Sequence, residues 1–79
     1  MKYFLSENNA VCSDLGSMTI ETLEECRSVP NWNFKEEQTV ENYPKGCYYY
    51  KASGNLYWNK HQAGARNDAA RQVCIHSGM

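Results

Sequence analysis

Four cysteines and two histidines are the residues of this 79-residue chain with the greatest capacity for chemistry. The cysteines stand far apart, without a Cys-x-x-Cys pair and without a histidine at metal-ligand spacing. Structural zinc sites draw their ligands from such close pairs, so this spacing favours disulfides over a metal site, with free buried thiols as the alternative. We therefore predict no metal, no cofactor, and two disulfides that involve Cys12, Cys26, Cys47 and Cys74.

The acid and base groups form no catalytic pattern. General acid–base catalysis needs converging titratable groups, and nucleophilic catalysis needs a nucleophile beside an oriented base. His61 and His76 fall in an expected loop and tail. Glu24 and Glu25 suit the start of a helix, where the helix dipole favours negative charge. A cysteine activated by His61 is the alternative, and we predict no catalytic residue and no enzymatic activity.

Four of the six tyrosines lie in the stretch 47–59. Two runs rich in aromatic residues flank a Ser-Gly pair there, and this pattern is typical of a β-hairpin. A two-residue turn at Ser53 and Gly54 places Tyr50 opposite Tyr57. We expect this hairpin to form the centre of the domain.

Alternation along the two strands assigns their side chains to two faces. The face expected in the core carries Cys47, Tyr49, Leu56 and Trp58. The opposite face carries a candidate binding surface, which consists of Tyr48, Tyr50, Tyr57, Asn55 and Asn59. Tyrosine rings and amide groups suit protein or carbohydrate partners. The alternative is that this face packs beneath residues 31–42, which we expect to form a long loop.

One short helix is predicted over about 22–29. Thr22 and Glu25 have the spacing of a capping box, in which each side chain accepts from the backbone amide of the other residue. Pro30 ends the helix, because the residue before a proline avoids the helical conformation.

The helix also suggests how the cysteines pair. Cys26 lies on its apolar face, so a helix packed on the hairpin brings Cys26 close to Cys47. This predicts a nested pairing, in which the second bond joins Cys12 to Cys74. The sequential pairing, Cys12 with Cys26 and Cys47 with Cys74, is the alternative.

The remaining segments predict short strands and irregular connections. Residues 2–6 read as a strand with 10–12 returning beside it, and 72–75 read as a closing strand. Residues 60–67 are expected to be irregular, with Asn67 capping a single helical turn. The predicted fold is a single small α+β domain over residues 1–79, stabilised by disulfides, with an antiparallel sheet.

Four blocks of the sequence carry a resemblance to known modules, over about residues 3–76. These blocks are Ile20-x5-Cys26, Pro44-x-Gly46-Cys47-Tyr48, Leu56-Tyr57-Trp58-Asn59 and Val73-Cys74. They resemble a small cysteine-containing module that recurs in predicted proteins of dinoflagellates and other marine microalgae and has no assigned function. The capped helix and the Gly-Cys-aromatic strand are also similar to apple (PAN) modules, which are extracellular binding domains. Apple modules usually carry a second helix cysteine, which is absent here after Cys26. The resemblance implies a fold class and a compartment, and no catalytic or ligand residue.

The charge and hydropathy of the chain argue against nucleic acid and membranes as partners. The net charge is -1 with both signs interspersed, which disfavours nucleic acid and anionic lipid. No apolar run approaches the roughly 18 residues of a membrane span, so no direct membrane insertion is expected. We make no prediction about oligomeric state.

Disulfides point to an oxidising compartment. The first residues leave no room for a signal-peptide hydrophobic region, so we expect a domain excised from a larger chain. The predicted function is an extracellular or lumenal binding module without catalytic activity. The alternative is a purely structural spacer or assembly domain of a larger secreted or membrane-anchored protein.

Overall fold

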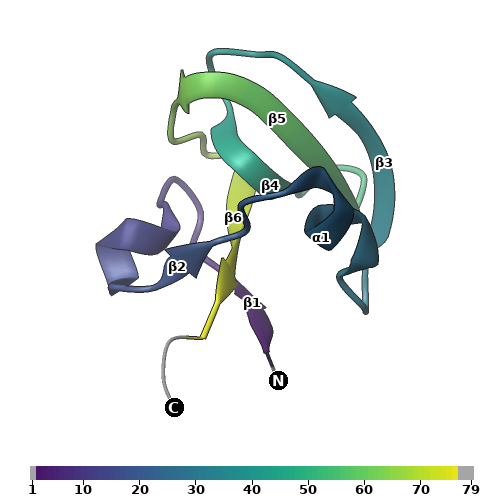
Figure 1. Cartoon of the computed structure of the whole chain (residues 1–79). Helices are drawn as coiled ribbons and strands as arrows, with labels where there is room; N and C mark the ends of the chain where they lie inside the picture. Colours follow the sequence, from purple (N-terminus) through teal and green to yellow (C-terminus); the bar gives the residue numbers. More distant parts are fainter. Residues whose placement is uncertain (1, 77–79) are drawn as a thin grey trace.

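The computed structural model describes residues 2–76, which form six strands and one short α-helix. The elements in chain order are β1 (Tyr3–Leu5), the 3-10 helix η1 (Cys12–Leu15), β2 (Met18–Thr19), α1 (Leu23–Ser28), β3 (Asn33–Gln38), β4 (Pro44–Tyr50), β5 (Asn55–Gly64) and β6 (Ala70–Ile75). The strand order is β1-β6-β4-β5-β3, with β2 also paired to β6 (Figure 1). The predicted small α+β domain with a central hairpin and one short helix is confirmed.

The β4–β5 hairpin is shifted by two residues from its predicted register. Tyr48 pairs with Tyr57, where the prediction paired Tyr50 with it. The predicted two-residue turn is wrong, because the amides of Ser53 and Gly54 both donate to the Tyr50 carbonyl and close a four-residue loop. A shift of two residues leaves each side chain on its predicted face, since side chains alternate with a period of two.

Half of the predicted long loop over residues 31–42 is the edge strand β3, so that prediction is wrong. β3 runs parallel to β5, with Phe34 opposite Leu56, and the sheet is therefore mixed rather than wholly antiparallel. An irregularity between Phe34 and Glu36 breaks the alternation of side chains. Exposed charged residues are common on edge strands, where they discourage pairing with other chains.

Two of the shorter connections also differ from expectation. Residues 10–12 lead into η1 instead of pairing with β1, because β1 pairs with β6. β5 continues to Gly64, through part of the segment predicted to be irregular. Asn67 forms a tight turn rather than a helical one: its side-chain oxygen accepts from the Ala69 amide at 2.8 Å, and β6 begins directly afterwards.

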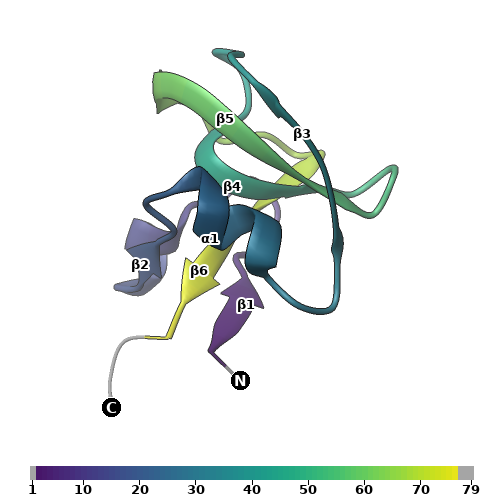
Figure 2. The same cartoon turned by 45° about the vertical axis from the view of Figure 1, so that its right-hand side comes forward.

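The helix α1 packs against β3, β4 and β5 on one face of the sheet (Figure 2). Its start is the predicted one, because the Thr22 hydroxyl accepts from the Glu25 amide at 3.1 Å. The Glu25 carboxylate accepts from the Tyr3 hydroxyl at 2.8 Å and pairs with Lys2. Glu25 therefore also ties the helix to β1.

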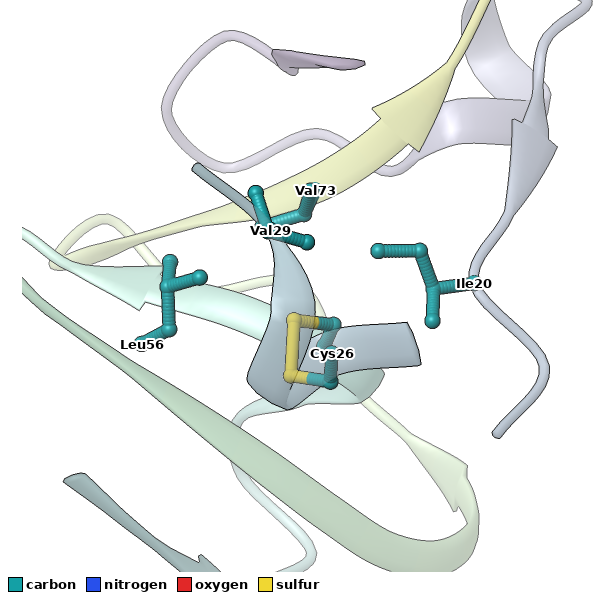
Figure 3. Packing of buried hydrophobic residues seen from close by; sticks show 6 residues of the cluster. Ile20, Cys26, Val29, Leu56 and Val73 are labelled. Carbon is teal, nitrogen blue, oxygen red and sulfur yellow. A yellow bond between two sulfur atoms is a disulfide. The ribbon is translucent and has the colours of Figure 1, made fainter. Parts of the chain in front are cut away.

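The core lies between α1 and the sheet. Its buried members are Ile20, Cys26, Val29, Cys47, Leu56 and Val73. Figure 3 shows these side chains around the disulfide that joins α1 to β4. Within residues 2–76, no helix is long and apolar enough to cross a membrane.

Both disulfides follow the nested arrangement. Cys26 bonds to Cys47, and Cys12 bonds to Cys74, each with the two Cα atoms 5.5 Å apart. The first bond fixes α1 on the hairpin, as the packing of the two apolar faces predicts. The second fixes η1 to β6, so both covalent links cross between elements that are distant in sequence.

Candidate binding surface

Four tyrosines gather on the face of the sheet opposite α1. Tyr48 and Tyr50 come from β4, Tyr57 comes from β5, and Tyr43 directly precedes β4. Together with Gln38 at the end of β3, they line a concavity of about 230 Å³. We call these five residues the tyrosine cluster.

The four rings form a closed circuit with a defined shape. Tyr48 stacks on Tyr43 with centroids 5.3 Å apart, and on Tyr57 with centroids 5.5 Å apart. Tyr50 stands nearly perpendicular to Tyr43 and Tyr57, at 5.9 and 6.2 Å. Stacked and edge-to-face pairs are each worth about 0.5–1.5 kcal/mol beyond burial, so the rings hold one another in place.

Two tyrosines of the cluster, Tyr43 and Tyr48, have pKa values raised above the usual tyrosine value. Tyr48 is only 2% exposed, and its hydroxyl donates to the side-chain oxygen of Gln38. Burial, followed by the neighbouring tyrosines, raises the pKa of Tyr48 well above its usual range. Burial also raises the pKa of Tyr43, with a further contribution from the Tyr50 hydroxyl. Tyr48 thus forms a neutral floor for the concavity.

Asn59 was predicted to lie on the binding surface, but the structure gives it a different role. It is 1% exposed, and its amide nitrogen donates to the carbonyls of Val40, Tyr43 and Pro44 at 2.8, 3.1 and 3.0 Å. Its side-chain oxygen accepts from the amides of Val40 and His61. All of its hydrogen-bonding capacity is used inside the protein. Asn59 therefore positions the segment that carries Tyr43 and does not face a ligand.

The other predicted surface residues share one face, as alternation requires. Tyr48, Tyr50 and Tyr57 come together in the cluster. Asn55 begins β5 on the same face as Tyr57 and does not line the concavity. The alternative prediction was that residues 31–42 cover this whole face. Only Tyr48 and Asn59 are fully buried, whereas Tyr50 and Tyr57 are half-buried, so the alternative is wrong for the face as a whole.

Sequence reasoning missed Tyr43 and Gln38 as members of the cluster. Tyr43 belongs to the aromatic-rich stretch, and its place just before Pro44 was the available signal. Gln38 ends a charged run and carries no signal of its own. Both reach the cluster through tertiary contacts, Gln38 by the parallel pairing of β3 and Tyr43 by its link to Asn59.

The groups with catalytic potential serve structural purposes in this fold. The Nδ1 atom of His61 accepts from the amides of Ala63 and Gly64 at 3.2 and 2.9 Å, which shapes the end of β5. The His76 ring packs on Phe4 with centroids 4.4 Å apart. All four cysteines form disulfides. Across residues 2–76, no three histidine, cysteine or acidic side chains are grouped to hold a metal ion.

A second hollow region lies around Lys45, and we call it the Lys45 groove. It consists of two adjoining cavities of about 360 and 150 Å³ that share Thr19 and Lys45. Arg66 lines the larger cavity and forms an ion pair with Asp14 in η1, and the hydrogen bond from Arg66 holds the pKa of Asp14 below its usual value. This groove is larger than the concavity of the tyrosine cluster but lacks a comparable concentration of one side-chain type.

No known protein family, no curated protein and no solved structure matches this chain. The resemblances to the algal module and to apple modules therefore stay predictions. The function has to be inferred from the geometry of the domain itself.

Proposed function

We propose that this domain is an extracellular or lumenal binding module without catalytic activity, and that the tyrosine cluster is its ligand site. The observation that carries this proposal is the concavity lined by four tyrosines, of which Tyr43, Tyr50 and Tyr57 are only half-buried. Rings that are rigid, partly exposed and tipped with hydroxyl groups supply both apolar contact and hydrogen bonds at little cost in entropy.

The two disulfides support the proposed extracellular or lumenal location, because both are oxidising compartments. A domain of this size has a small core, and the two bonds close sequence separations of 21 and 62 residues. In the chain-entropy model such loops stabilise the folded state by about 3 and 4 kcal/mol, which is a large share of the net stability of a small domain. Such bonds persist in oxidising compartments and are reduced in the cytosol.

A purely structural spacer is the competing function. A spacer works by separating its two ends. In this domain the His76 amide donates to the Lys2 carbonyl at 2.9 Å, so both ends of the described chain lie side by side (Figure 1). If a longer chain continues past Lys2 and His76, the domain projects sideways from that chain and does not lengthen it. This geometry suits a displayed binding surface better than a spacer.

Glycan and peptide arrays probed with the non-reduced domain test this proposal. We expect at least one ligand class to bind, and Tyr50→Ser to abolish that binding without changing the fold, because Tyr50 is half-buried. Met18→Ser is the matched control, since Met18 is an exposed apolar residue of β2, outside the cluster. Binding of neither an array ligand nor a small-molecule headgroup, or binding that Tyr50→Ser leaves intact, would contradict the proposal.

A further inference from the structure

We propose that the tyrosine cluster binds a quaternary ammonium group of the choline type. This inference rests on the proposed function, because it names the ligand class of the same site. It is based on the arrangement of the rings, the size of the concavity and the charges around it.

The ring arrangement suits a cation. Each of the four centroids lies between 5.3 and 6.2 Å from its two neighbours in the circuit. A group in the middle of the circuit therefore lies within about 6 Å of the centroids of the half-buried rings Tyr43, Tyr50 and Tyr57, the range of a cation–π contact, while the buried Tyr48 stacks on two of them and closes the floor. Because Tyr50 is perpendicular to Tyr43 and Tyr57, the rings surround this point with walls in different planes rather than forming one flat platform.

The size of the concavity selects a small group. Pockets for drug-sized ligands measure about 300–1,000 Å³, whereas this concavity measures about 230 Å³. It can enclose one compact group at a time, whether that group is a free headgroup or the end of a longer glycan or peptide. A trimethylammonium group is compact and nearly spherical, so it can contact several rings at once.

The surrounding charge favours a positive ligand. Glu36 lies opposite Tyr57 in the β3–β5 pairing and shares its face. Burial is the main cause of the raised pKa of Tyr48, the neighbouring tyrosines come next, and the Glu36 carboxylate also contributes. Among the ion pairs of residues 2–76, Glu37 binds Lys60, but Glu36 has no partner. The Glu36 charge is therefore available to attract a cation at this face.

The ring faces are also free of the cations of the protein itself. The two cation–π contacts within residues 2–76 involve Lys2 with Tyr3 and Arg27 with Phe34, away from the cluster. A methylated ammonium group fits better than a primary one, because it has no N–H donors to satisfy. The Gln38 side-chain oxygen, the natural acceptor at this site, already receives the Tyr48 hydroxyl.

The test compares choline with its neutral isostere, in which a tert-butyl group replaces the trimethylammonium group. Titration of the non-reduced domain by calorimetry should give choline about tenfold tighter binding than the isostere, as one good cation–π site implies. Tyr57→Leu should abolish choline binding. Tyr50→Phe should retain it, because the phenylalanine keeps the ring.

Two neighbouring carboxylates on β3 provide a matched pair of variants. Glu36→Gln should weaken choline binding several-fold at low salt, and less at high salt because ions screen the charge. Glu37→Gln should leave binding unchanged, since Glu37 pairs with Lys60 on the other face. Equal binding of choline and the isostere, or binding of array ligands without choline, would overturn the ligand class but keep the binding function. A domain that binds neither choline nor any array ligand would overturn both proposals.

Discussion

Replacing Asn59 by alanine should be among the most damaging single changes to this domain. The substitution removes five hydrogen bonds, of which three reach Val40 and Tyr43 before β4, one reaches Pro44 at the start of β4, and one is local to β5. The Pro44 carbonyl is buried and loses its partner, which costs about 1–3 kcal/mol. The other four bonds are part-buried, so water can replace them, and each should cost about 0.5 kcal/mol or slightly more. We expect Asn59→Ala to lower the free energy of unfolding by about 3–5 kcal/mol.

Denaturant unfolding of the non-reduced proteins measures this loss, with Asn55→Ala as the control. Asn55 lies on the same strand and the same face, and its described hydrogen bond uses the backbone amide, so its substitution should cost less than about 0.5 kcal/mol. A cost for Asn59→Ala within about 1 kcal/mol of the control would refute our view that this amide holds the segment carrying Tyr43.

Three further predictions concern single residues. Thr22→Ala should cost about 1 kcal/mol by loss of the helix cap, and an unchanged denaturation midpoint would show that the helix starts elsewhere. Tyr48 should be among the last tyrosines to ionise in an absorbance titration. Because burial raises its pKa in the folded state above the usual tyrosine value of about 10, its contribution to stability is present below that pH and is lost as the pH rises. Normal ionisation of all six tyrosines in the folded protein would contradict this. Asp14→Asn should lower the melting temperature at neutral pH, because folding lowers the pKa of Asp14 and its charged form therefore stabilises the fold above about pH 3.8. The difference in melting temperature between the two proteins should vanish as the pH falls below that value. A difference that persists in acid would exclude the ion pair with Arg66 as its cause.

Features that depend on local pattern could be predicted from the sequence. Side chains along a strand alternate with a period of two, so the faces of the hairpin were correct although the register was wrong by two residues. The capping spacing of Thr22 placed the helix, and the helix placed Cys26 on its apolar face. The Cys26–Cys47 bond followed from bringing these two faces together.

Features that depend on distant contacts could not be predicted in the same way. β3 pairs in parallel with β5, and its charged residues and the irregularity after Phe34 obscure the strand pattern. Alternation placed Asn59 on the tyrosine face but did not reveal which segment covers it. That segment is positioned by the carbonyls of Val40, Tyr43 and Pro44, which the sequence does not distinguish from any others.

The location of the ligand site can be tested most directly by NMR. Spectra of the non-reduced domain, with labelled backbone amides and tyrosine rings, are recorded during titration with choline and with any ligand found on the arrays. We expect the ring signals of Tyr43, Tyr50 and Tyr57 to shift together and to reach saturation. The amide signals of residues around the Lys45 groove should not shift. Shifts centred on Lys45 and Arg66, with the tyrosine rings unchanged, would place the binding site elsewhere and contradict the proposed function of the tyrosine cluster.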